Sequence, residues 1–358
     1  MSVMAASREI CAPGAPCTRR DFIRQLGGAA ALALRPGREP APDRPSAPVA
    51  LVKGQPRAAA VRRALELLGP PAVAGRDVYL KASYNSAEPF PASTDPEMLR
   101  AVVRALRDLH CRRILLVERS GMGVSSEIWR ETGLLEILKS LQVTPLPLES
   151  LEPDRWRREE LPGSHWKHGV EVPWFLGPDA CVVQICNLKA HRFGAIYSGS
   201  LKNSVGLLAK RGLAAGRPYN YMEELHSSPD QRLMIAEINQ LYEPAVVLMD
   251  ATRVMVEGGP DRGKVVNAEV ILASRDRVAV DAAGVALLRL QGATGRLARI
   301  PVFQQEQIRR AAELGLGVRS AAEIDFLPAD EAGRRLMHRL NANLSEAAEA
   351  EKKPAGNS

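Results

Sequence analysis

Short apolar runs alternate along this chain with amphipathic helical patterns, and this alternation limits the possible folds more than any other feature. In the segment 95–110, Leu99, Val102 and Leu106 recur on one face, as in a helix that covers a core. Strand–helix–strand alternation at this spacing predicts an α/β fold with a largely parallel sheet covered by helices. In chain order, we expect strands at 78–84, 113–118, 143–148, 181–186, 245–250 and 268–273, and helices at 57–68, 95–110, 126–141, 229–241, 278–290 and 305–314.

The predicted α/β domain spans residues 50–345. Pro145 and Pro147 lie in its third predicted strand, and because proline lacks an N–H donor they place that strand at an edge of the sheet. Residues 150–179 show no period, so we expect a surface excursion that ends in a short strand. The Ala/Glu/Lys-rich segment 346–358 is expected to be a disordered tail.

The N-terminus carries a pattern typical of protein export. Arg19 and Arg20 precede Phe22 and then a short Gly/Ala-rich apolar run, which resembles a twin-arginine signal. The run is too short to span a bilayer, so we expect no transmembrane span. We assign residues 1–34 to the signal region and 35–49 to a Pro/Arg-rich linker, which predicts export to the periplasm or cell envelope by the twin-arginine machinery. The alternative is a chance arginine pair before a small core helix.

The charge of the chain does not indicate nucleic-acid binding. The net charge is +7, but residues 1–50 hold seven arginines and four acids, so the remainder has a net charge of only +4. No block of lysine and arginine stands out, and aromatic residues make up 4% of the chain, which leaves few stacking partners for bases. We therefore expect no nucleic-acid partner.

The five cysteines are scattered, and none forms a C-x-x-C pair. Because protein-bound clusters need several thiolate ligands at short spacing, we expect no iron–sulfur cluster. Cys111, Cys181 and Cys186 lie in apolar runs, which is typical of reduced core cysteines. The identity of any other cofactor is not indicated by the sequence.

The densest polar cluster follows the predicted strand 181–186, in what we interpret as a turn. It holds Asn187, Lys189 and His191, and if the strand geometry persists Lys189 and His191 share one face. A lysine and a histidine together suit an anion, a carbonyl group, or proton transfer near neutral pH. Lys189 and His191 are therefore candidate catalytic residues, with His191 as the acid/base, and Asn187 is a candidate cofactor contact. A solvated loop is the alternative.

A Ser/Gly segment after this cluster leads into a helical pattern. Hydroxyl groups and a flexible glycine before a helix can make an anion cradle, because the first N–H groups of a helix have no partner within it. We expect Ser200 and Asn203 to contact a ligand or cofactor there, and Lys202 to be a third candidate catalytic residue. Gly121 and Gly123 follow another predicted strand and form a weaker candidate cofactor loop. Ordinary capping and a plain turn are the alternatives.

Two histidines and two acids are candidate metal ligands: His191, His226, Asp250 and Glu257. Asp250 ends an apolar strand, which is a ligand-facing place in α/β sheets. Glu257 lies in a predicted turn-rich loop at 254–260. No fixed ligand spacing such as H-E-x-x-H accompanies these residues, so the identity of a metal stays open.

Two further acids belong to the predicted helix 278–290. Asp276 precedes the helix and is predicted to cap it. Asp281 lies inside the helix among apolar residues. A buried acid at that position needs a partner, such as an arginine or a lysine.

Several of these strings together resemble the family known as domain of unknown function 362, over roughly residues 76–320. The strings, in chain order, lie at 78–81 with Asn85, 187–191, 200–206, 256–260 and 276–282. The most specific are K-N-x-x-G at 202–206 and D-x-V-A-x-D at 276–281.

This resemblance implies a fold distantly similar to the N-terminal domain of lactate racemase, and twin-arginine signals are common in the family. Some members carry a ferredoxin module, whose cysteines this chain lacks. The chain reads Lys81-Ala82-Ser83 where relatives often have Lys-Pro-Asn, so no role is assigned to Lys81.

The sequence therefore predicts one ligand cleft at the carboxyl ends of the strands. Its expected lining residues are Lys189, His191, Lys202 and Asn203, with Asp250 or Glu257 on its rim. The preferred function is an exported protein that binds an anionic small molecule or cofactor, with or without the help of a metal ion. The alternative is a non-catalytic ligand-binding or accessory protein of the cell envelope.

Replacing both Arg19 and Arg20 with lysine is expected to leave the protein in the cytoplasm, because the arginine pair is the element that the export machinery reads. Cell fractionation and immunoblotting measure the exported share. The double replacement of Arg35 and Arg38 by lysine, in the linker, is the control and should be exported normally. Export of the first variant at the efficiency of the parent would contradict the signal assignment.

Overall fold

The computed structural model of the chain describes residues 46–214 and 216–350, with side chains up to residue 345. The predicted twin-arginine signal at 1–34 lies outside the described residues. The same holds for positions 35–45 of the predicted linker and 351–358 of the predicted tail. The described residues therefore cover the predicted α/β domain and a few positions on either side.

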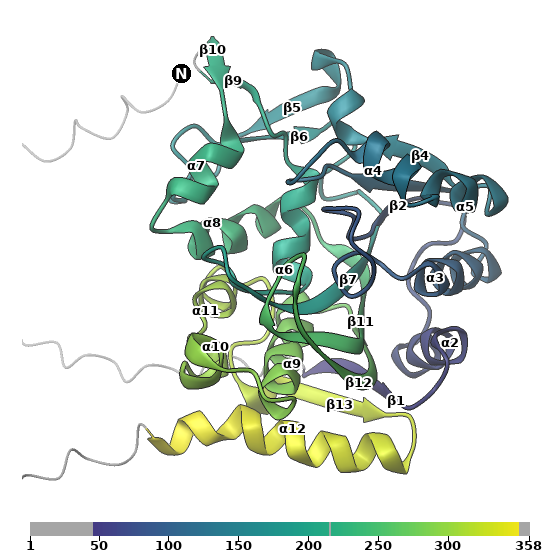
Figure 1. Ribbon diagram of the computed structural model, residues 1–358, viewed down its shortest axis with the longest axis vertical. Helices are drawn as coiled ribbons and strands as arrows, with labels where there is room; N and C mark the ends of the chain where they lie inside the picture. The colour runs from purple at the N-terminus through teal and green to yellow at the C-terminus, as the bar shows by residue number, and fades with distance from the viewer. Residues whose placement is uncertain (1–45, 215, 351–358) are drawn as a thin grey trace, which may run out of the picture. The chain divides into compact units, whose positions relative to one another are not determined.

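One large sheet forms the centre of the described domain (Figure 1). Its strands are β1 (Ala47–Lys53), β2 (Asp77–Lys81), β3 (Arg113–Glu118), β4 (Thr144–Pro147), β7 (Val182–His191), β8 (Ile196–Ser198), β11 (Pro244–Gly258), β12 (Gly263–Ser274) and β13 (Ile324–Pro328). Their order is β13-β1-β12-β11-β7-β2-β3-β4, with β8 paired to the end of β7. From β11 to β4 all neighbours are parallel, whereas β12 is antiparallel to β11 and to β1. The predicted α/β fold with a largely parallel sheet is confirmed, and β4, with its two prolines, lies at an edge.

Helices cover both faces of this sheet (Figure 1). One face carries α2 (Arg57–Leu68), α3 (Pro96–Asp108), α4 (Ser125–Glu131) and α5 (Leu134–Ser140). The other carries α6 (Ser200–Asn203), α7 (Tyr221–Ser227), α8 (Gln231–Glu237), α9 (Arg277–Leu290), α10 (Gly295–Arg299), α11 (Glu306–Glu313) and α12 (Glu331–Ala350). Two short hairpins, β5 (Trp156–Glu159) with β6 (Val170–Pro173) and β9 (Gly212–Ala214) with β10 (Arg217–Tyr219), stand apart from the sheet. Within the described ranges, no helix combines the length and the apolar character needed to cross a membrane.

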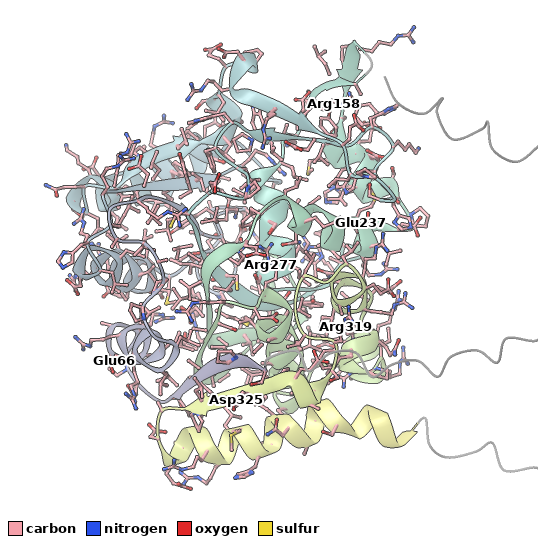
Figure 2. The ribbon with its side chains drawn as sticks, turned by 180° about the vertical axis from the view of Figure 1, so that it is seen from behind. Glu66, Arg158, Glu237, Arg277, Arg319 and Asp325 are labelled. Atoms are coloured by element: carbon pink, nitrogen blue, oxygen red, sulfur yellow. The ribbon has the colours of Figure 1, made fainter. Side chains whose placement is uncertain are left out.

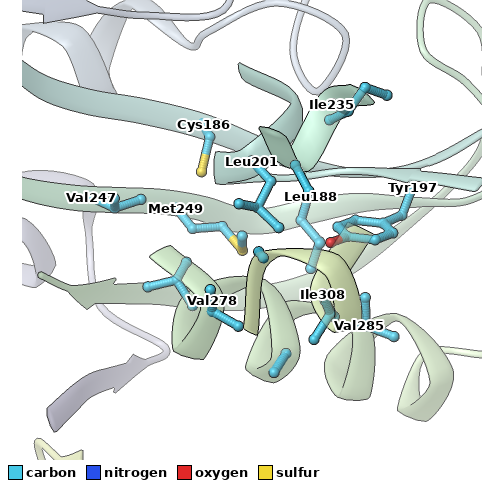
Figure 3. Close-up of a cluster of buried hydrophobic side chains, with 14 of the residues drawn as sticks. Cys186, Leu188, Tyr197, Leu201, Ile235, Val247, Met249, Val278, Val285 and Ile308 are labelled. Carbon is cyan, nitrogen blue, oxygen red and sulfur yellow. The ribbon is translucent and has the colours of Figure 1, made fainter. Parts of the chain in front are cut away.

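The central strand β7 separates two apolar cores. Val183 and Ile185 point toward α2 and α3, and Cys186 and Leu188 point toward α9 (Figure 3). All ten residues of β7 are buried, and the alternation of side chains between the two faces follows from the two-residue period of a strand. The strand therefore has a fixed register, since a slip by one residue would exchange its two faces.

Two predicted turns are continuous strand. A turn is expected after position 186, but β7 continues to His191, where it pairs with β8 and so finds partners for its backbone groups. The predicted loop at 254–260 is likewise strand as far as Gly258, because β11 forms a long hairpin with β12. Both predictions are wrong. Asn187, Lys189 and His191 are buried strand residues despite their polarity, and the turn indicated by the Gly-Gly-Pro string at 258–260 begins only where β11 ends.

Other boundaries differ by a few residues. β1 begins at Ala47, within the predicted linker, because it pairs with β13 from that residue on. The predicted helix 126–141 is two helices, since Gly133 adopts a left-handed φ of +69° between them. The last helix continues to position 350, into the tail predicted as disordered from 346. The predicted cap at Asp276 is confirmed, because its carboxylate accepts from the first N–H groups of α9.

Candidate functional site

The site lies where the sheet reverses its direction of growth. The chain builds β2, β3 and β4 outward and then returns to β7 on the other side of β2. In open α/β sheets, ligands bind at such a switch point, beyond the carboxyl ends of the strands. A cavity of about 160 Å³ opens there, and it is lined by the last residues of β2 and β3 and by Lys189 and His191 of β7.

The structure brings together seven residues that the sequence singles out, although they come from four separate segments. They are Gly121, Asn187, Lys189, His191, Lys202, Asn203 and His226. Four others do not line this cavity: Gly123, Ser200, Asp250 and Glu257.

Sequence reasoning missed a buried ion pair that lines the cavity. Lys81 ends β2 and Glu118 ends β3, and they form an ion pair with an Nζ–Oε2 distance of 3.0 Å. The Lys81 Nζ also donates to the Asn203 Oδ1 at 2.9 Å, and Glu118 accepts from the backbone N–H groups of Tyr84 and Arg119. Their position at the ends of apolar strands is the sequence signal that could have found them.

The K-N-x-x-G string packs against this ion pair, and each of its three specified residues, Lys202, Asn203 and Gly206, has a different role. Lys202 lines the cavity. Asn203 accepts from Lys81 and donates through Nδ2 to a backbone carbonyl of β7 at 3.2 Å. A Cβ on Gly206 would lie 2.1 Å from the Glu118 Oε1 and 3.0 Å from the Lys81 Nζ. A side chain at position 206 would therefore displace the pair.

The predicted anion cradle at the start of α6 is filled by the protein itself. The Asp281 carboxylate accepts from the backbone N–H groups of Ser200 at 2.6 Å and Leu201 at 3.0 Å. A Cβ on Gly199 would lie 2.4 Å from the Asp281 Oδ1, so the glycine makes room for this carboxylate. The Ser200 hydroxyl donates to the Gln184 Oε1 at 2.6 Å. The predicted ligand contact through Ser200 is therefore wrong, because its polar groups are used inside the fold.

Asp281 ties α9 to α6. The Tyr197 hydroxyl also donates to Asp281, at 3.3 Å. Among the described residues, no arginine or lysine of the kind expected from the sequence forms an ion pair with Asp281. Burial raises the pKa of Asp281 to about 7, against the hydrogen bonds that lower it.

A second connection between α9 and α6 runs through Arg277, which lies in the interior (Figure 2). Arg277 donates to the Asn239 Oδ1 at 2.5 Å, and the Asn239 Nδ2 donates to the Leu201 carbonyl at 3.1 Å. Two independent contacts thus hold α6, the helix that contains Lys202.

The glycine loop after β3 is closed by its own hydrogen bonds. The Gly121 N–H donates to the Asn85 Oδ1 at 2.7 Å, and the Gly123 N–H donates to the Ser120 Oγ at 3.0 Å. Both backbone donors are occupied within the loop, which favours the alternative of a plain turn, and the cofactor contact expected here stays a prediction. Gly121 still forms part of the cavity wall.

Asn187 and Lys189 are held by the loop that follows β2. The Asn187 Nδ2 donates to the Pro91 carbonyl at 2.9 Å, and the Lys189 Nζ donates to the Ala92 carbonyl at 2.5 Å. In contrast, the Asn187 Oδ1 is buried and has no hydrogen-bond partner among the described residues. Leaving such an oxygen unpaired costs roughly 1–3 kcal/mol, so this atom is suited to accept from a donor in the cavity.

Burial weakens the charge of both cavity lysines. It lowers the pKa of Lys189 to about 7, with a further contribution from the charge of Lys202. It lowers the pKa of Lys202 to about 8, and there the charge of Arg119 contributes. Within the described ranges neither lysine forms an ion pair, and the Lys202 Nζ makes no hydrogen bond. Each ammonium can therefore accept an anion as its partner.

The two histidines of the cavity are held in different tautomers. The His191 Nδ1 accepts from the Phe193 N–H at 3.2 Å, which leaves the ring proton on Nε2. The His226 Nδ1 donates to the Met222 carbonyl at 2.6 Å, which leaves Nε2 as an acceptor. Burial and then the charge of Lys202 lower the pKa of His191, and burial also lowers the pKa of His226. Near neutral pH the cavity thus offers one N–H donor and one basic nitrogen.

The four candidate metal ligands do not come together. Asp250 is buried outside the cavity in an ion pair with Arg57, with an Nε–Oδ2 distance of 2.7 Å. Glu257 lies on an exposed part of β11 and lines a neighbouring cavity with His191, without His226. Among the residues that the structure describes, no group of three or more His, Cys, Asp or Glu side chains could hold a metal ion. The predicted metal site is therefore wrong, because Asp250 is already paired with a helix distant in sequence.

Comparison with known proteins agrees with the likeness seen in the K-N-x-x-G and D-x-V-A-x-D strings. One family model, described as Domain of unknown function (DUF362), matches residues 78–286. That span contains both strings and every described residue that lines the cavity. No curated protein matches the chain.

Replacing Gly206 with alanine should destabilise the protein by roughly 1–3 kcal/mol, the scale of overpacking in a dense core. The physical reason is the 2.1 Å approach of the new Cβ to the Glu118 Oε1. Urea unfolding measures the loss. Gly177→Ala is the matched control, because its Cβ would meet only an arginine side chain at 3.7 Å. Equal stability of the two variants would contradict the argument.

Replacing Lys189 with methionine should raise the free energy of unfolding at pH 7 and flatten its pH dependence. The pKa of Lys189 is about 7 in the folded protein, against an ordinary value of 10.5. Between these values the unfolded chain binds more protons, so the parent gains stability as the pH rises, whereas below pH 7 both states are protonated.

Denaturant unfolding of parent and variant at intervals from pH 6 to about pH 9 tests this, because the difference between the two proteins isolates the titration of Lys189. The excess stability of the variant should shrink above pH 7. Lys264→Met, at an exposed position of β12, controls for the loss of a lysine charge. A difference that stays constant over this pH range would show that Lys189 is not desolvated in the folded protein.

Proposed function

The chain belongs to the DUF362 family, and we propose that its cavity binds a small anionic molecule or cofactor. The description of the family assigns no activity, so the proposal rests on the residues that line the cavity. The observation that carries this proposal is that two cavity lysines, Lys189 and Lys202, have no acidic partner in the part of the chain that the structure describes. Of the described residues that line the cavity, Glu118 is the one acid, and it is already paired with Lys81. Lys189, Lys202 and Arg119 leave an excess of positive charge that an anion would neutralise.

The roles of the individual residues follow from their hydrogen bonds. Lys202 would bind the anion directly, since its Nζ has no other partner among the described residues, and Lys189 would add a second charge. The unpaired Asn187 Oδ1 would accept from a donor group on the ligand or from a water molecule. The Asn203 amide is engaged by Lys81 and β7, so it holds Lys81 in place and does not contact the ligand.

The cavity also contains proton donors and acceptors of the kind that proton transfer needs. His191 would present an N–H donor and His226 a basic nitrogen, and an amine with a pKa near 7 can give or take a proton at physiological pH. These features favour an enzyme in which His226 or Lys189 transfers the proton, His191 donates a hydrogen bond and the lysines stabilise negative charge. The four candidate metal ligands are not gathered at the cavity, so no metal ion takes part in this proposal.

The alternative is a non-catalytic ligand-binding or accessory protein of the cell envelope. It is favoured by the small volume of the cavity, about 160 Å³, which leaves little room for two reacting molecules. A bound anion that is recovered unchanged after long incubation would favour the alternative. Conversion of the anion that depends on His191 would favour the enzyme.

We further propose that the protein is exported by the twin-arginine machinery to the periplasm or cell envelope. The support lies in the Arg19-Arg20 pair and the short apolar run that follows it. This segment lies outside the described residues. The expected likeness of the fold to the lactate racemase N-terminal domain stays a prediction and contributes nothing to the proposal.

Replacing Lys202 with methionine should weaken the binding of inorganic phosphate by about 1.5–3 kcal/mol, the scale of a hydrogen bond to a charged group, or roughly 10- to 150-fold in Kd. Isothermal titration calorimetry at low ionic strength measures this. The thermal stability of the variant should not fall, because the Lys202 ammonium has no hydrogen-bond or ion-pair partner among residues 46–214 and 216–345. Lys264→Met, outside the cavity, removes the same net charge and should bind as the parent does. Equal losses in the two variants would mean that phosphate responds only to overall charge.

A further inference from the structure

The opening of the cavity differs in chemistry from its interior. Lys189 and Asn187 are 3% and 2% exposed, whereas Met122 and Phe193, which line the same cavity, are 52% and 51% exposed. Side chains that line a cavity and are half open to solvent stand at its opening. The opening therefore presents large apolar groups to water in front of a charged interior.

Three separate segments build this apolar rim, which consists of Met122, Phe193 and Pro260. Met122 belongs to the loop after β3, Phe193 to the turn between β7 and β8, and Pro260 to the turn between β11 and β12. The Phe193 ring is held beside Arg192, whose guanidinium carbon lies 4.4 Å from the ring centroid. Single exposed apolar residues are common, but apolar side chains gathered at the edge of a charged cavity are typical of a binding site.

The cavity is smaller than the sites that enclose a drug-sized molecule. Its volume is about 160 Å³. Sites that enclose a small molecule have roughly 300–1,000 Å³. The interior can hold an anionic group with a few attached atoms, next to Lys189 and Lys202. Any further part of the ligand must pass the opening and contact the rim.

We propose that the ligand is a soluble organic acid, whose anionic group binds the cavity lysines and whose apolar chain or ring packs against Phe193 and Met122. This inference rests on the proposed function, because it assumes that an anion enters the cavity. An inorganic anion would leave the rim exposed, and an uncharged apolar molecule would leave the Lys202 ammonium without a partner. The unpaired Asn187 Oδ1 adds a third condition, namely a hydrogen-bond donor near the anionic group or a water molecule bound with it.

Calorimetric titration with phosphate, acetate, hexanoate and 3-phenylpropanoate tests this inference. Because burial of each methylene contributes up to about 0.8 kcal/mol and the rim covers only part of a chain, hexanoate and 3-phenylpropanoate should bind roughly tenfold more tightly than acetate. Phe193→Ala should remove most of this gain and change the Kd for phosphate and acetate by no more than about twofold. Leu213→Ala is the matched control, since Leu213 is 58% exposed but does not line the cavity.

The outcomes separate the two proposals. If phosphate and acetate bind through Lys202 but the longer acids bind no more tightly, the anion site holds and the inference about the rim is overturned. If none of the four anions binds, both proposals fail. If the longer acids gain nothing over acetate and the protein instead binds vesicles of anionic phospholipid through Phe193, the rim is a lipid contact and the inference is again overturned. A gain that is lost in Phe193→Ala and kept in Leu213→Ala supports it.

Discussion

The ion pair of Lys81 and Glu118 is the contact on which the rest of the site depends. Taking two charges out of water costs several kcal/mol for each ion, so such a pair persists only where further polar groups complete it. Here Asn203 and two backbone N–H groups do so, and Gly206 leaves the necessary space. Because the two charges end β2 and β3 while Asn203 and Gly206 follow β7, the pair joins the three strands that meet at the switch point.

A second carboxylate decides what kind of anion site the cavity can be. Asp281 occupies the N–H groups at the start of α6, so those donors are unavailable to a ligand. The positive charge of the cavity therefore comes from the side chains of Arg119, Lys189 and Lys202. Burial lowers the pKa of Lys189 to about 7 and that of Lys202 to about 8, so both lysines titrate near neutral pH. A site built in this way responds to pH, whereas a site made of backbone N–H groups would keep its charge distribution at any pH.

The apolar cores on both sides of β7 offset the free-energy cost of burying the charged groups of the cavity. One core packs α2 and α3 against the sheet, and the other packs α9, α11 and α12 against it (Figures 1 and 3). Burial of apolar surface is the main favourable term in folding, and two continuous cores supply it away from the cavity. The polar half of β7, from Asn187 to His191, can then be built from groups that suit a ligand instead of the core.

The sequence by itself determined the α/β class, the largely parallel sheet, the edge position of β4 and the cap at Asp276, because these depend on residue period, proline and local hydrogen bonds. It also indicated Lys189 and Lys202, since polar groups near strand ends mark ligand sites in such folds. Only the tertiary structure decided which of the candidates share a cavity. Ser200 is paired with Asp281, Asp250 with Arg57, and Lys81 with Glu118. Each of these pairs joins residues far apart in the chain, and no local pattern records which buried charge will meet which partner when the strands and helices pack.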